Sequence, residues 1–320
     1  MLTVRLEKIC LTNWGYIIQI TNKLLMNWSL LKGILWIFIF CSSCNRNLEQ
    51  KNVLLSFSFR LDNDFVYDQF ILDLINLKKL KVQNVGIELI IKNNEKNEPL
   101  IDFSPNFDKV LNELKLQGFQ SHIILSKWND ESILIDDTTF LKTWNLKYQK
   151  LVSKFLNDFA KFNIKFFIFA VDFLNIEKMP ELYKDWVKEI QKNYKIPVVY
   201  STHLHKVLDC PLNEYLDYIG IFYEHEPRDR FKKLARNLHP KISEKFHNKK
   251  ILITHANVEG KDALLKTQNL LRFWKKNNLF LLNFNSIYNQ TVISRDSSYF
   301  SLKSNLEFLN YLQKYQKKNK

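Results

Sequence analysis

Acidic and histidine side chains stand directly after short apolar runs in this sequence. Asp172 follows FFIFAV, Glu224 follows IGIFY, and His255 follows ILIT. Two carboxyl groups, or a carboxyl group and an imidazole, can share general acid–base work when the fold brings them together. We therefore take Asp172, Glu224 and His255 as candidate catalytic residues.

A second group of side chains at the same kind of position suits sugar binding. Aromatic rings stack on the apolar faces of sugars, and amides, hydroxyls and imidazoles hydrogen-bond to sugar hydroxyls. The candidate substrate-binding residues are Trp128, Asn175, His203, Tyr223, Asn257, Asn283 and Asn285.

Eight apolar runs of strand length alternate with longer amphipathic segments of helical spacing. The expected strands are 53–59, 85–91, 122–128, 165–171, 197–203, 219–225, 251–257 and 279–285. Helices are expected at 64–80, 139–162 and 261–278, with a last one at 300–316. Eight strands that alternate with helices in about 270 residues predict a single-domain (β/α)8 TIM barrel of the α/β class.

An open doubly wound sheet uses similar strands and is the alternative fold. Such sheets usually carry a glycine-rich first turn around a ligand phosphate, and the stretch VLLSFSFRLDND has no glycine. With only 6 glycines in the chain, no dinucleotide or P-loop motif is present. In the barrel, the candidate residues would gather at the C-terminal ends of the strands, where TIM-barrel enzymes hold their active sites.

The stretch from Trp144 to Asn257 resembles the family-113 glycoside hydrolases, which are β-mannanase-type barrels of the large retaining clan. The matching features, in order, are Trp144 and Tyr148 in W-x-x-x-Y, FFIFAVDF, Pro180 and Trp186 in P-x-L-Y-K-D-W, Tyr200 and Ser201, LDYIGIFY, and KILITHANVEG. The resemblance implies an oligo- or polysaccharide ligand, a site that needs no cofactor or metal, and no nucleic acid partner. We expect a monomer.

Both catalytic positions of that family differ here. Where the family has its acid/base glutamate this chain has Asp172, and where it has its nucleophile the chain has His255. A retaining glycosidase needs two carboxyl groups about 5–5.5 Å apart, and histidine cannot form the usual glycosyl ester. The favoured interpretation is a glycan-binding barrel with a degenerate catalytic site.

Two other interpretations remain open. In the first, the protein is an active hydrolase in which Asp172 is the acid and Glu224, Glu226 or Glu259 is a displaced base, an inverting arrangement that needs about 6.5–9.5 Å between carboxyls. In the second, a metal-dependent hydrolase uses His203, His225 and His255, since imidazoles that converge from neighbouring strands can ligate zinc.

The N-terminal region resembles a bacterial lipoprotein signal. Lys32 precedes the apolar run GILWIFIF, and two small residues precede Cys44, which would carry the lipid. We then expect residues 1–43 to be an N-terminal extension and signal peptide, 44–51 a tether and 52–320 the barrel. The protein would be secreted through the inner membrane and lipid-anchored in the cell envelope. Residues 1–25 would be an upstream start-site artefact, and a retained anchor helix is the alternative.

Charge and cysteine content agree with this organisation. The formal net charge is +14, with lysines scattered over helical faces, which we interpret mainly as compositional bias that also favours anionic lipid surfaces. After cleavage and lipidation only Cys210 remains as a thiol, so no intramolecular disulfide is expected.

Overall fold

The structure is a computed structural model of the 320-residue chain. It describes residues 53–61, 65–102, 104–127, 137–162, 164–223, 237–238, 240–256, 263–274, 279–284, 310–312 and 314–315. The predicted signal segment, Cys44 and the tether lie outside these residues.

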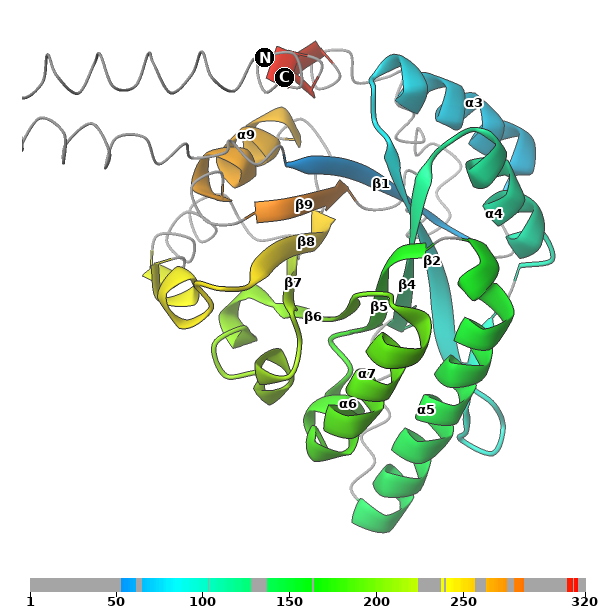
Figure 1. The fold of residues 1–320 in the computed structure, drawn as a ribbon, viewed down its shortest axis with the longest axis vertical. Helices are drawn as coiled ribbons and strands as arrows, with labels where there is room; N and C mark the ends of the chain where they lie inside the picture. The colour runs from blue at the N-terminus through cyan, green and yellow to red at the C-terminus, as the bar shows by residue number, and fades with distance from the viewer. Residues whose placement is uncertain are drawn as a thin grey trace, which may run out of the picture. The chain divides into compact units, whose positions relative to one another are not determined.

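Eight parallel strands close into a barrel (Figure 1). They are β1 (Leu54–Arg60), β2 (Asn84–Asn93), β4 (Gln120–Lys127), β5 (Ile164–Val171), β6 (Val198–His203), β7 (Tyr218–Tyr223), β8 (Lys250–Ala256) and β9 (Leu279–Phe284). Closure is shown by β1, which pairs in parallel with β9 on one side and with β2 on the other. The predicted (β/α)8 barrel is confirmed.

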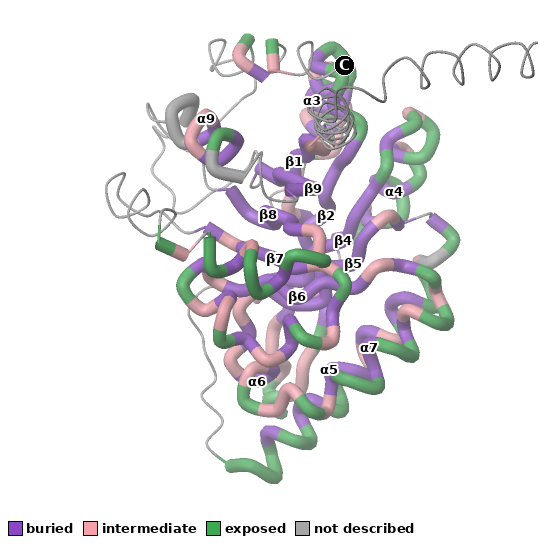
Figure 2. Tube along the Cα trace, turned by 60° about the vertical axis from the view of Figure 1, so that its left-hand side comes forward, coloured by how far each residue is buried: buried purple, intermediate pink, exposed green. Residues whose placement is uncertain are grey.

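Amphipathic helices surround the strands. They are α3 (Tyr67–Lys79), α4 (Phe107–Leu116), α5 (Thr138–Phe159), α6 (Leu174–Glu177), α7 (Glu181–Tyr194) and α9 (Ala263–Trp274), with 3₁₀ turns at Ala160–Phe162, Leu204–Lys206 and Pro211–Glu214. Their inner faces are buried and their outer faces exposed, as Figure 2 shows for α5 and α7. None of the helices within the described ranges has the length and apolar content needed to cross a membrane.

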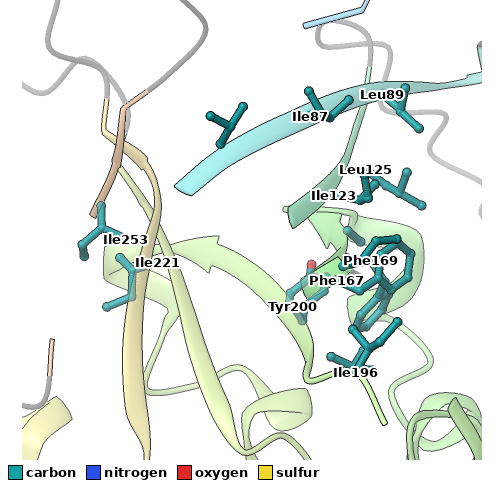
Figure 3. Packing of buried hydrophobic residues seen from close by; sticks show 14 of the residues in the cluster. Ile87, Leu89, Ile123, Leu125, Phe167, Phe169, Ile196, Tyr200, Ile221 and Ile253 are labelled. Carbon is teal, nitrogen blue, oxygen red and sulfur yellow. The ribbon is translucent and has the colours of Figure 1, made fainter. Parts of the chain in front are cut away.

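Strand residues alternate between two apolar layers because successive side chains point to opposite faces of a sheet. The outer layer packs under the helices and includes Ile87, Leu89, Ile123, Leu125, Phe167 and Phe169 (Figure 3). The inner layer fills the barrel and consists of Ile124, Phe166, Ile168, Val171, Val199, Leu252 and Leu281. The barrel is therefore a packed core on both faces of its strands.

One strand was absent from the sequence prediction. β3 (Pro99–Asp102) pairs antiparallel with the C-terminal half of β2, where Ile91 faces Ile101 and Asn93 faces Pro99. The hairpin contacts α5, because Lys147 forms an ion pair with Glu98 and the Trp144 indole donates a hydrogen bond to Asn93 Oδ1 at 3.0 Å. It therefore extends the sheet beyond the barrel at the C-terminal end of β2.

Candidate functional site

The C-terminal half of the barrel interior is polar. β1 places Arg60 inward and β2 places Glu88 inward, since Glu88 alternates with the outer-layer residues Ile87 and Leu89. Arg60 Nη2 donates to Glu88 Oε1 at 2.9 Å, and Ser126 Oγ on β4 donates to the same oxygen at 2.6 Å. Three strands thus meet at one buried carboxylate.

Glu88 is ionised in this setting. Only 2% of its side chain is exposed, and burial alone would raise its pKa. The adjacent Arg60 guanidinium and the His255 imidazole outweigh burial and lower the pKa of Glu88 well below its ordinary value. A permanently charged carboxylate therefore lies in the centre of the barrel.

His255 reaches this centre because β8 is irregular. Ile253 pairs with Ile221 while His255 pairs with the next residue of β7, Phe222, so Thr254 is an extra residue in β8. Such a bulge re-aims the following side chain. The Thr254 hydroxyl then shares a hydrogen bond with the Ser201 hydroxyl of β6 inside the barrel. His255 also faces inward, next to Thr254.

The imidazole of His255 is enclosed by protein. Its side chain is 7% exposed, its Nδ1 lies 3.2 Å from Thr254 Oγ1, and its Nε2 lies 3.8 Å from Glu88 Oε1. The second distance exceeds a hydrogen bond, so the contact with Glu88 is electrostatic. Both ring nitrogens consequently face groups of the barrel itself.

Asp172 begins the loop after β5 and adopts a left-handed backbone conformation, with φ at +52°. Its backbone N–H donates to Ser201 O at 2.8 Å, which fixes the turn against β6. The carboxylate contacts two nitrogen donors, His203 Nε2 at 3.2 Å and Lys206 Nζ at 2.9 Å. Such a conformation is uncommon outside glycine, asparagine and aspartate, so the backbone here is held by its surroundings.

These partners decide the charge of Asp172. Burial would raise its pKa, but the hydrogen bonds from His203 and Lys206 outweigh burial and lower the pKa to about 2. Lys206 in turn has a raised pKa, because its bond to Asp172 outweighs its own partial burial. At neutral pH the pair is a carboxylate and an ammonium.

A second carboxylate lies beside the first. Glu177, at the end of α6, has its Oε2 3.6 Å from Lys206 Nζ, and its Oε1 accepts from the Tyr200 hydroxyl at 2.8 Å. Thr202 Oγ1 donates to the same oxygen at 3.3 Å. Lys206 therefore lies between two carboxylates and contacts both, one from the β5 loop and one from α6.

The rings of His203, Phe222 and His255 line the ends of β6, β7 and β8, and the His205 ring of the following 3₁₀ turn lies beside His203. The ring centroids of His203 and Phe222 lie 4.0 Å apart, those of Phe222 and His255 6.0 Å, and those of His203 and His205 5.2 Å. Phe222 is partly exposed, unlike the fully enclosed strand residues below it. Because His203 contacts the Asp172 carboxylate, this group of rings lies beside that carboxylate.

The other predicted site residues are distributed as follows. Asn175 lies buried in α6, where its carbonyl accepts from Asn145 Nδ2 at 3.0 Å. Tyr223, 5% exposed, belongs to the outer apolar layer. Asn283 is fully buried, and its Nδ2 donates to Thr254 O at 2.7 Å and to Ser58 Oγ at 3.2 Å. The predicted residues Trp128, Glu224, Asn257 and Asn285 lie outside the described residues, as do Glu226 and Glu259.

Sequence reasoning missed Glu88 and the roles of Lys206 and Glu177. The signal for Glu88 was present, because a single acid inside the apolar run VGIELII must either disrupt the strand or pair inside the barrel. Arg60 directly follows the apolar run VLLSFSF, but nothing in the local sequence indicates its partner on another strand. Lys206 and Glu177 gave no sequence signal of their own.

Metal ligation finds no support in the described part of the chain. No three histidine, cysteine, aspartate or glutamate side chains gather there in a way that could hold an ion. His203 and His255 are separated by the Phe222 ring, and the third predicted ligand, His225, lies outside the described residues.

Comparison with solved structures defines the class of fold as that of the TIM-barrel glycoside hydrolases. A "GH113 beta-1,4-mannanase" superimposes with a TM-score of 0.62 at 11% identity, covering 83% of this chain and 99% of the mannanase. The GH113 β-mannanase from Alicyclobacillus acidocaldarius gives a TM-score of 0.59 at 12% identity, covering 83% and 99%.

Another mannanase and an enzyme with a different printed activity share the fold. The endo-1,4-β-mannanase from Rhizomucor miehei gives a TM-score of 0.53 at 10% identity, with 79% of this chain and 92% of that one covered. A putative α-L-fucosidase from Bacteroides thetaiotaomicron gives 0.55 at 11% identity, covering 83% and 93%. No family model and no curated protein matches the sequence. At these identities the likeness is one of fold.

Proposed function

We propose that this protein binds an oligo- or polysaccharide at the C-terminal end of its barrel without hydrolysing it. One observation carries the proposal: the residues at both positions of the family's catalytic glutamates are engaged by the protein itself. Asp172 is held by His203 and Lys206, and His255 faces Thr254 and Glu88.

Neither residue has the state that glycosidic cleavage needs. A general acid must carry a proton at working pH, whereas Asp172 has a pKa of about 2. A retaining nucleophile must be a carboxylate directed at the anomeric carbon. His255 supplies an enclosed imidazole instead, and the nearby carboxylate of Glu88 is occupied by Arg60 and Ser126.

The same groups are suitable for holding a sugar. The partly exposed Phe222 ring offers an apolar surface for a pyranose face, and Asp172 with His203 offers an acceptor and a donor beside it. A fixed carboxylate that keeps its charge is a good acceptor for sugar hydroxyls. We assign Phe222 as the stacking platform and Asp172 as the principal polar contact.

The test combines binding and turnover on β-mannan oligosaccharides. Titration calorimetry should detect binding by the wild-type protein, and chromatography of long incubations should detect no cleavage. Phe222→Ala should weaken binding by about fivefold, since loss of one stacked ring costs on the order of 1 kcal/mol. Phe222→Tyr should retain binding, and Phe140→Ala, which alters an exposed ring on α5, should leave it unchanged.

The alternative is an active hydrolase with rewired carboxylates, in which Asp172 is the acid. Glu177 favours this alternative, because Lys206 contacts both Glu177 and Asp172 and so places two carboxylates in one cluster. Cleavage by the wild-type protein that disappears in His255→Ala or Asp172→Asn would overturn the binding proposal.

We further propose that the protein is a cell-envelope lipoprotein attached through Cys44. The sequence around that cysteine supports the attachment, with an apolar run too short to span a bilayer and small residues before the cysteine. Residues 44–51 would then connect the lipid to the barrel.

A further inference from the structure

The N-terminal end of the barrel, opposite the candidate site, carries two lysines on an aromatic base. Phe166, Tyr218 and Phe280 form a triangle with ring centroids 5.6–6.0 Å apart. Lys250 Nζ lies 4.5 Å from the Phe280 ring and 5.6 Å from Tyr218, and Lys165 Nζ lies 5.9 Å from Phe166. The rings close the bottom of the barrel, and the ammonium groups lie over them.

The two lysines are not neutralised by the part of the chain that the structure describes. Lys165 donates to the neutral amide oxygen of Gln120, and no carboxylate in the described ranges forms an ion pair with either lysine. Burial and then the nearby charge of Lys250 lower the pKa of Lys165. Like charges kept close without a counter-ion favour an anion from outside.

The loops that lead into the strands at this end are basic as well. Lys81, Lys161, Lys195 and Lys249 occupy them, against two acidic side chains, Glu214 and Asp217, in the described segment that leads into β7. A lysine near the C-terminus of a helix is stabilised by the negative end of the helix dipole, so lysines are expected there. Lys165 and Lys250 stand on strands, so the dipole does not account for them.

The chain also enters the barrel at this end. β1 begins at Leu54 and its first residues belong to the same rim as the start of β5 and β8. Nine residues separate Cys44 from Leu54, so the ten steps of chain between them span at most about 35 Å when fully extended. A lipid on Cys44 would therefore keep this rim near the bilayer.

We propose that the N-terminal rim of the barrel is a docking surface for an anionic phospholipid membrane. Lys165 and Lys250 contact the headgroup phosphates, with Lys81, Lys161 and Lys195 around them. The candidate sugar site then faces away from the membrane. This inference uses the proposed attachment at Cys44 to select the membrane as the partner, and it is independent of what the sugar site binds.

The experiment uses the full-length protein in nanodiscs of neutral phosphatidylcholine or of phosphatidylcholine with phosphatidylglycerol. Acetylation of individual lysines is followed by mass spectrometry. Lys165, Lys195 and Lys250 should react several-fold more slowly in the anionic discs, whereas Lys150 and Lys154, exposed on α5, should react equally in both. Retention of the protein in neutral discs reports anchoring separately from docking.

Vesicle flotation then tests the lysines by substitution. Lys165→Gln with Lys250→Gln should weaken binding to anionic vesicles about fivefold per lysine removed, with the loss disappearing at high salt. The matched control is Lys150→Gln with Lys154→Gln, which should bind as the wild type does. Equal labelling in the two kinds of disc, protection by free phosphate alone, or equal loss in both variants would overturn the docking surface.

Discussion

At the scale of single residues, the chemistry of the site is set by how its charged side chains are paired. Arg60 pairs with Glu88, and Lys206 contacts both Asp172 and Glu177. A carboxylate held in this way keeps its charge and loses its use as a proton donor. Two predictions belong to this scale, one for Asp172 and one for His255.

The first concerns Asp172. Its pKa in the folded protein, about 2, is below the ordinary value of 3.8, so its ionised form stabilises the fold. This contribution is complete above about pH 4 and is lost as the pH falls towards 2. Asp172→Asn, which tolerates the left-handed backbone, should lower the free energy of unfolding by up to about 2 kcal/mol at pH 6.

Urea unfolding at pH 3 to 6 measures this difference, which should shrink as the pH falls. Asp185→Asn is the control, because Asp185 is 94% exposed and should show no such trend. A difference independent of pH would show that the pairing with His203 and Lys206 is not its source.

The second prediction concerns the restoration of glutamate at position 255. His255 Nε2 lies 3.8 Å from Glu88 Oε1, so His255→Glu would bring two carboxylates together in the barrel centre. We expect a loss of about 2–4 kcal/mol in unfolding free energy relative to His255→Gln, since an uncompensated buried charge is costly. Restoring the family residue alone should therefore yield neither stability nor efficient hydrolysis.

Adding Glu88→Gln to His255→Glu should recover most of that loss, and thermal or urea unfolding of the four variants forms a double-mutant cycle. Absence of coupling between the two positions would mean that the side chains do not meet as described.

At the scale of elements, close approach between strands depends on two glycines. A Cβ at Gly86 of β2 would lie 2.7 Å from His122 Nε2, and one at Gly220 of β7 would lie 2.5 Å from the backbone oxygen of Tyr200. The missing side chain at Gly86 therefore leaves room for the His122 ring, and the missing side chain at Gly220 leaves room for the backbone of β6.

We expect Gly220→Ala to be the more damaging substitution, because a backbone cannot move aside as a side chain can. Overpacking typically costs about 1–3 kcal/mol, and Gly86→Ala should fall within this range. His122→Ala should partly rescue Gly86→Ala, because the Ser58 Cβ 2.9 Å from the new methyl group remains, and should leave Gly220→Ala unrescued, as measured by thermal unfolding. Rescue of both, or of neither, would contradict the described packing.

The positions of the strands were largely predictable from the sequence, because buried parallel strands are nearly continuous apolar runs. The predicted 165–171 and 251–257 differ from β5 and β8 by a residue at their ends. β3 was missed because PLID is short and begins with proline. The site was less predictable, since the Glu88–Arg60–His255 contacts depend on barrel closure and on a bulge at Thr254 that local patterns do not encode.

At the scale of the whole molecule, the barrel has two chemically different ends. The C-terminal end holds neutralised charges and rings, while the N-terminal end holds lysines and the entry of the chain. Attachment through Cys44 is the prediction that belongs here. Cys44→Ser should block lipidation, release the protein from the membrane fraction and alter its processing.

Fractionation with an immunoblot and mass spectrometry of the mature N-terminus measures this outcome. Cys41→Ser is the matched control and should be processed normally. Unchanged membrane association and unchanged size of the Cys44→Ser protein would favour a retained anchor helix instead.

The short β3 strand bears on how the protein avoids self-association. A closed barrel has no strand edges, so β3 is where the described sheet ends, and an unprotected edge invites another copy to add its own strand. β3 is only 4 residues long, starts with Pro99, which has no N–H to donate, and ends at Asp102, paired with Lys92. These features make fibril growth from this edge unfavourable, so the hairpin can extend from the barrel without adding a strand from another copy.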